Sequence, residues 1–120
     1  MNAIHASIHI KDLRLRTFIG FNEEEKVKKQ DVVINIMIQY NAESAMQSDD
    51  VSDAYNYKIL TKKIIALVEN NRFNLLEKLA NDVMSLITES DAVTSAQVII
   101  DKPHALRFAD SVAIELNFSK

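Results

Sequence analysis

The sequence contains no cysteine and no tryptophan, and it has one glycine and one proline, Gly20 and Pro103. Without cysteine the chain can form neither a disulfide nor a thiolate nucleophile, and cysteine-based zinc sites are excluded. A single glycine rules out the glycine-rich loops that hold the phosphates of nucleotides. The glycine and the proline both stand at the ends of strand-like segments, where such residues mark changes of chain direction.

Charge and length exclude further classes of protein. The net charge is -3, whereas a general nucleic-acid binder carries a basic surplus. No apolar run approaches the roughly 20 residues of a membrane span, and residues 1–10 lack the basic start and apolar core of a signal peptide. We therefore expect a cytoplasmic protein that binds neither nucleic acid nor membrane. Its 120 residues predict one domain, residues 1–120, with little room for a deep pocket, which favours a ligand site shared with a neighbouring subunit.

Two segments in the first third of the chain have the period of two that is typical of strands. Residues 4–18 read as one strand with an irregularity near Lys11 and Asp12, and residues 31–40 alternate apolar and more polar positions. The charged residues 22–29 between them read as a long hairpin connection. The sequence therefore predicts an antiparallel pair of long strands.

Helical and strand-like patterns follow in the remaining chain. After a polar connection at residues 48–53, helical spacing of apolar residues predicts helices over residues 57–69 and 75–88, the second with Asn74 as its N-cap. Residues 93–101 and 110–118 read as the last two strands. The order ββααββ predicts an α+β fold, with a four-stranded antiparallel sheet and two helices on one face. A ferredoxin-like domain, in which each helix lies between strands, does not fit.

Four short motifs lie at the junctions of these elements. They are Ile-Gly-Phe-Asn-Glu-Glu-Glu at residues 19–25, Asn-Tyr at 56–57, Asn-Leu-Leu-Glu at 74–77 and Asp-Lys-Pro at 101–103. In this order and spacing the chain resembles the dihydroneopterin aldolase/epimerase family, which has the tunnelling fold. The resemblance covers nearly the whole chain. It implies a homo-oligomer, commonly an octamer of two tetrameric rings, whose active sites lie between subunits.

The resemblance implies that Glu77 and Leu76 bind the pterin ring of the substrate. A carboxylate suits this role because it only accepts hydrogen bonds, and it can take two at once from the pterin amino group and the adjacent ring N–H. Taken without the resemblance, Glu77 has a second interpretation. It stands three residues after Asn74, which is the spacing of a capping box.

The resemblance also implies three catalytic residues, Lys102, Tyr57 and Glu25. A partly desolvated lysine can transfer protons near neutral pH, and the tyrosine hydroxyl can exchange a proton with substrate or water. Each has a simpler interpretation: Lys102 as a solvated loop lysine, Tyr57 as a helix-start residue packed on the core, and Glu25 as part of a solvated run of charges. The adjacent Glu23 and Glu24 leave the assignment of Glu25 open by one position.

Within the family, residues 13–20 and 101–111 look more like the triphosphate epimerases than the aldolases. Both activities begin by cleaving the C1'–C2' bond of the dihydroneopterin side chain, with the pterin ring as the electron sink, so the resemblance implies neither a metal nor a cofactor. An epimerase substrate with a triphosphate needs cations, and His104 and Arg107 are expected to supply them. Arg14 and Arg16 are weaker candidates, since alternating arginines on a strand are typical of a solvated face. An aldolase, a non-catalytic pterin- or purine-binding module and a structural assembly protein remain alternatives.

Overall fold

Two long strands form the centre of the structure, a computed structural model that describes residues 4–120. β1 (His5–Ile19) and β2 (Gln30–Asn41) pair antiparallel, as the alternating pattern predicts. Their register shifts between Ile10 and Leu13, which confirms the irregularity expected near Lys11 and Asp12. Residues 1–3 lie outside the described range. They are part of residues 1–10, for which the sequence predicts no signal peptide.

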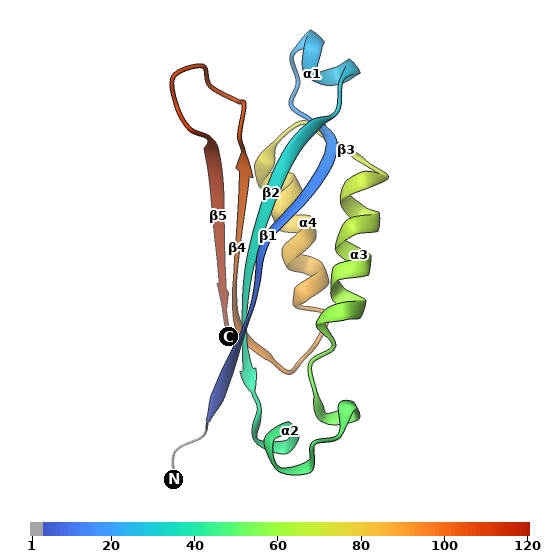
Figure 1. Ribbon diagram of the computed structural model, residues 1–120, viewed down its shortest axis with the longest axis vertical. Coiled ribbons are helices and arrows are strands. Elements are labelled where there is room, and N and C mark those ends of the chain that lie inside the picture. Colours follow the sequence, from blue (N-terminus) through green and yellow to red (C-terminus); the bar gives the residue numbers. More distant parts are fainter. Residues whose placement is uncertain (1–3) are drawn as a thin grey trace.

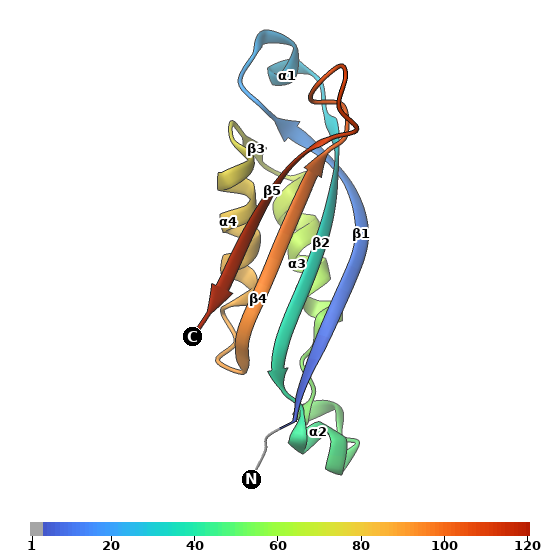
Figure 2. The ribbon, with the colours of Figure 1, turned by 90° about the vertical axis from the view of Figure 1, so that its left-hand side faces the viewer.

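The register shift is a β-bulge whose geometry is held by side chains. Asp12 has a φ of 51°, a left-handed conformation that aspartate adopts more readily than most residues. The Asn35 side chain on β2 accepts a hydrogen bond from the Asp12 backbone N–H at 2.9 Å and donates to the Asp12 carboxylate at 3.3 Å. A bulge of this kind bends and twists the strand that carries it, and β1 curves along its length in Figure 2.

The sheet is mixed and has the order β3-β1-β2-β4-β5. β4 (Val93–Lys102) pairs antiparallel with β2 and with β5 (Val112–Ser119), as predicted. β3 (Arg72–Phe73) adds a fifth, parallel strand beside the end of β1. The predicted four-stranded sheet is therefore correct in its antiparallel part but lacks β3, because two residues are too few to give a readable period.

Two antiparallel helices cover one face of the sheet, and no other element covers the opposite face within residues 4–120 (Figures 1 and 2). They are α3 (Tyr57–Glu69) and α4 (Leu76–Ile87). The bounds of α3 agree with the prediction, and those of α4 differ from it by one residue at each end. None of the described helices combines the length and apolar character needed to cross a bilayer.

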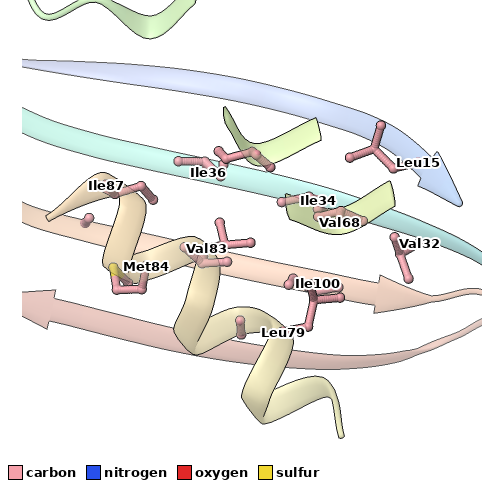
Figure 3. Packing of buried hydrophobic residues seen from close by; sticks show 14 of the residues in the cluster. Leu15, Val32, Ile34, Ile36, Val68, Leu79, Val83, Met84, Ile87 and Ile100 are labelled. Carbon is pink, nitrogen blue, oxygen red and sulfur yellow. The ribbon is translucent and has the colours of Figure 1, made fainter. Parts of the chain in front are cut away.

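The hydrophobic core lies between these helices and the inner face of the sheet (Figure 3). β-Branched side chains dominate the strand side of this layer, which suits them because they pack well on a pleated surface. Thr17 is also fully buried, and its hydroxyl donates to the Asn71 carbonyl at 3.1 Å. Fully buried residues that fill the layer include Ile34, Ile38, Ile64, Val68, Leu79, Val83, Ile87, Val98 and Ile100.

Short helices occupy two connections that the sequence pattern presents as loops. The predicted hairpin connection contains α1 (Glu23–Val27), and the polar connection after β2 is flanked by α2 (Glu43–Ser48) and contains η1 (Val51–Asp53). Asn74 is not the N-cap of α4. That position is Leu75, which makes no side-chain capping bond. Segments of three to six residues hold too few turns for a helical period to be visible.

Candidate active site

Glu25, the predicted site residue of the β1–β2 connection, meets the end of β4 at one end of the sheet. In Figure 1, α1 and the carboxyl ends of β1 and β4 lie at the top of the molecule. Asn22 begins α1: its side chain accepts a hydrogen bond from the Glu25 N–H at 2.8 Å, and its own N–H donates to Glu25 Oε1 at 3.4 Å. This capping box fixes the side chain of Glu25 relative to the backbone.

Glu25 and Lys102 form an ion pair across this end of the sheet. Lys102 Nζ donates a short hydrogen bond to Glu25 Oε2, and their side chains are only 12% and 19% exposed. The hydrogen bond from Lys102 lowers the pKa of the Glu25 carboxyl below its ordinary value of 4.5, while partial burial acts in the opposite direction. The pair therefore places a lysine ammonium and a carboxylate together in a sparsely hydrated position.

Of the three adjacent glutamates, Glu25 is the one that contacts Lys102. Glu23 and Glu24 are exposed, whereas Glu25 is partly buried against Lys102. Lys102, in turn, is not a solvated loop lysine, since it is the last residue of β4 and its side chain is mostly buried. The structure therefore brings Glu25 and Lys102, two of the three residues predicted to be catalytic, into contact.

Gly20 leaves the space that the Glu25 carboxylate occupies. Its φ is +116°, in the region that favours glycine, and a Cβ built there would overlap all three atoms of that carboxylate group. The Gly20 N–H donates to the Phe73 carbonyl at 2.9 Å, which ties the end of β1 to β3. The expected backbone role of Gly20 is therefore accompanied by a second role, close approach of Glu25.

Gln30 supports the pair and was not singled out by the sequence. Its Nε2 donates to the Ile19 carbonyl at 2.6 Å and lies 3.4 Å from Glu25 Oε2. The side chain thereby links the first residue of β2 to the last residue of β1 beside the carboxylate. No sequence motif marks a glutamine in this role, but the Asn22–Glu25 capping-box spacing was readable in the sequence.

The pterin-binding candidates lie at the start of α4, at the same end of the molecule. α4 begins three residues after β3, which pairs with the end of β1. Glu77 is exposed and Leu76 is partly buried. The capping-box interpretation of Glu77 is wrong, because Asn74 does not cap this helix. The carboxylate is thus exposed at a helix start, where a negative charge is favourable.

Tyr57 is the one predicted catalytic residue that the chain does not bring to this end. It is the first residue of α3 and is 49% exposed, and α3 carries the chain from there toward β3 (Figure 1). A helix of 13 residues is roughly 20 Å long. Within one chain, Tyr57 therefore lies about one helix length from the end of the sheet where Lys102 ends β4.

The neighbouring Tyr55 packs against other parts of the fold. Its ring centroid lies 6.0 Å from that of Tyr40, and its hydroxyl points to the Ile87 carbonyl at 3.5 Å. Burial raises the pKa of the Tyr55 hydroxyl, and the nearby Glu89 carboxylate raises it further. Tyr40 and Tyr55 both line a cavity of about 510 Å³, which none of the predicted site residues borders.

The predicted phosphate-binding cations separate into two positions. His104 lines a cavity of about 350 Å³ that Glu25 also lines. Arg107 is exposed in the loop between β4 and β5, with its guanidinium 5.5 Å from the Phe108 ring centroid. Arg14 and Arg16 lie on the uncovered face of the sheet, where Arg16 pairs with Asp31 at 3.3 Å. Within residues 4–120, His, Asp and Glu side chains do not gather in groups of three that could hold a metal.

The fold and the site define a class of protein: a small α+β domain of the tunnelling fold with a half-buried lysine–glutamate pair at the sheet end. A family model described as dihydroneopterin aldolase (FolB) matches residues 8–117. The chain belongs to the dihydroneopterin aldolase family.

Curated relatives and a solved structure refine this result. The chain is 56% identical over 115 residues to the dihydroneopterin triphosphate 2'-epimerase of Escherichia coli K12, covering 96% of both chains. It is 54% identical to the enzyme of the same name from Pseudomonas aeruginosa, covering 92% of this chain and 90% of that one. Identity to the dihydroneopterin aldolase of E. coli K12 is 28%, over 89% of this chain and 88% of the aldolase. An E. coli dihydroneopterin aldolase structure in complex with neopterin superposes with a TM-score of 0.89 at 26% identity, over 95% of this chain and 99% of that one.

Proposed function

We propose that this protein epimerises 7,8-dihydroneopterin triphosphate at C2', giving 7,8-dihydromonapterin triphosphate. The observation that carries this proposal is the twofold difference in identity: 56% to a triphosphate epimerase and 28% to an aldolase from the same organism. The Glu25–Lys102 pair supplies the proton-transferring groups that either reaction requires.

The reaction is a retro-aldol cleavage followed by an aldol addition. Loss of the 2'-hydroxyl proton allows the C1'–C2' bond to break, and its electron pair passes into the dihydropterin ring. The aldehyde formed at C2' turns its other face to C1', the bond forms again, and the 2'-oxygen regains a proton. Lys102 and Glu25 are proposed to move these protons, since a half-buried ion pair can exchange a proton without free access of water.

Glu77 and Leu76 are proposed to orient the pterin ring beside this pair. The exposed Glu77 carboxylate at the start of α4 has no hydrogen-bonding role in capping the helix. It can therefore accept two hydrogen bonds from the pterin amino group and ring N–H. The structure of E. coli dihydroneopterin aldolase with neopterin supports a pterin as the ligand. His104 and Arg107 are proposed to meet the triphosphate, and His104 already borders the cavity next to Glu25.

Tyr57 is proposed to reach the site from a second subunit. One helix length separates it from Lys102 in the same chain, so a site with both residues requires two chains. We propose a homo-oligomer with sites between neighbouring subunits, and an octamer of two tetrameric rings as its form. Sedimentation at micromolar concentration measures the assembly, and a monomer would contradict the shared site.

A subunit-mixing experiment tests the shared site directly. Lys102→Ala and Tyr57→Phe variants, each purified as an inactive protein, are unfolded together and refolded. If a site takes the two residues from different chains, random mixing restores about a quarter of the sites. Refolding each variant alone is the control. If the mixture stays as inactive as its parents, the two residues act within one chain.

Product analysis separates epimerase from aldolase. The purified protein is incubated with 7,8-dihydroneopterin triphosphate, and the dephosphorylated, oxidised products are resolved by chromatography. Monapterin as the main product supports the proposed function, with any 6-hydroxymethylpterin reporting a weaker aldolase activity. The family model and the 28% identity favour the aldolase as the second candidate, and mainly 6-hydroxymethylpterin would establish it.

A non-catalytic pterin-binding role is tested by the same assay. Lys102→Ala and Tyr57→Phe are expected to lower kcat by about 10²-fold or more, the usual contribution of a positioned proton donor or acceptor. Pterin binding, measured by calorimetry, is expected to be retained. Turnover at the wild-type rate in both variants would show that these residues are not catalytic.

A further inference from the structure

The cavity beside Glu25 has a basic wall that includes two lysines outside the predicted site residues. It measures about 350 Å³, within the range of small-molecule pockets. Lys28 and Lys29, which follow α1, line it together with His104 from the loop after β4. Glu25 borders the same cavity, so these cations adjoin the proposed reaction centre.

Within residues 4–120, the side chains of Lys28, Lys29 and His104 make long or solvent-exposed contacts. Lys28 lies 3.6 Å from Glu24, and both side chains are more than 70% exposed. Lys29 lies 5.8 Å from the Phe18 ring centroid, and His104 lies 4.0 Å from Asp31. Exposed pairs of this kind contribute little to stability. The cations are therefore free to turn toward an anion without a large loss elsewhere.

Two arginines fix the backbone that carries the lysines. The Arg16 guanidinium on β1 donates to the Lys29 carbonyl at 3.1 Å, and that of Arg72 on β3 donates to the Lys26 carbonyl at 2.7 Å. Arg72 thus anchors α1 itself, through Lys26, and Arg16 anchors the segment after it, through Lys29. Arg16, a weaker phosphate candidate in the sequence, thus holds the backbone of Lys29.

We propose that Lys28, Lys29 and His104 bind the triphosphate of the substrate and determine the preference for phosphorylated over free dihydroneopterin. This inference rests on the proposed function. The triphosphate is attached to the carbon next to C2', so its phosphates must lie close to the groups that act on C2'. The cavity meets that requirement because Glu25 lines it. Its acidic wall is compensated, since Lys102 pairs with Glu25 and the exposed Glu24 can turn to solvent.

The test compares two substrates in one double variant, Lys28→Ala/Lys29→Ala. For dihydroneopterin triphosphate, kcat/KM is expected to fall roughly tenfold for each lysine, mainly through KM. For free dihydroneopterin, kcat/KM is expected to stay within about twofold of wild type. The matched control is Lys58→Ala/Lys62→Ala, which removes two exposed lysines of α3 and should change neither value. Equal losses for both substrates, or no loss for the triphosphate, would overturn the proposal.

A binding measurement keeps this test separate from the proposed function. Inorganic tripolyphosphate is titrated calorimetrically into wild type and the double variant, each checked for unchanged thermal unfolding. If tripolyphosphate binds the wild type and its affinity for the double variant is at least tenfold lower, the site is supported, even if the wild type proves to be an aldolase. Absence of binding to wild type, or equal affinities, removes the phosphate site whichever reaction is catalysed. His104→Gln is expected to weaken binding as well, because His104 lines the same cavity.

Discussion

Replacing Gly20 by alanine perturbs two features of the site at once. At a φ of +116° an alanine is strained, and such backbone strain costs about 1–3 kcal/mol. In addition, the new Cβ overlaps the Glu25 carboxylate, so Glu25 must move away from Lys102. We expect a less stable protein in which the proposed catalytic pair, Glu25 and Lys102, is also displaced.

Two assays read these effects separately. Thermal unfolding is expected to show a lower midpoint, by roughly 4 °C for each kcal/mol in a chain of this size. The kcat for 7,8-dihydroneopterin triphosphate is expected to fall at least about tenfold, since the two groups proposed to transfer protons no longer face each other. The fall in kcat should persist at temperatures well below the unfolding midpoint.

A double-mutant cycle with Glu25→Ala isolates the steric part. When the carboxylate is absent, the Cβ at position 20 no longer meets it, and only the backbone strain remains. Gly20→Ala should therefore cost less stability in the Glu25→Ala background than in wild type, a coupling that such cycles measure directly. Equal costs in both backgrounds would refute the role of Gly20 in making room for Glu25. If Gly20→Ala had wild-type stability and activity, the backbone argument would fail too.

Three further perturbations test other contacts. Because the folded-state pKa of Glu25 lies below 4.5, its ion pair stabilises the protein above about that pH and loses this effect as the pH falls further. The stability difference between wild type and Glu25→Gln, followed by denaturant unfolding, should therefore shrink in acid; a difference that grows would contradict the sign. Asn35→Ala removes both hydrogen bonds to Asp12 at the bulge and should cost about 1 kcal/mol in thermal unfolding, whereas an unchanged midpoint would mean that the bulge holds without them. Leu79→Ala in the core should lower the free energy of unfolding by about 2–5 kcal/mol, whereas Leu106→Ala at an exposed position should lower it by less than about 0.5 kcal/mol. Similar losses in both variants would contradict the burial of Leu79 in the core.

The parts of the fold that the sequence predicts are those with a repeated local pattern. α3 repeats its apolar stripe over three turns, and β2 alternates buried and less buried residues along most of its length, so both were visible from spacing alone. β3 has two residues and exists because Phe18 and Ile19 lie beside it in space. α1 is too short for a period, and its capping box was the one local signal that could have revealed it.

The site is less readable from the sequence because its contacts are non-local. Glu25 and Lys102 are separated by 77 positions, and no spacing rule connects them. The family resemblance supplied both residues, and the fold then distinguished Glu25 from its two acidic neighbours. Gln30 escaped notice for the same reason, since its contact with the Ile19 carbonyl depends on how two strands meet.

The Glu25 carboxylate divides its two oxygens between different tasks. Oε1 accepts the Asn22 N–H that begins α1, whereas Oε2 accepts from Lys102. Glu25→Ala therefore removes a helix cap along with a group proposed to be catalytic, so a loss of activity in this variant would not report on chemistry alone. Glu25→Gln keeps an amide oxygen for the Asn22 N–H and replaces only the charged contact. The order of α1 depends on the same side chain as the ion pair. Hydrogen exchange of the α1 backbone amides therefore reports locally on whether that pair is intact during turnover.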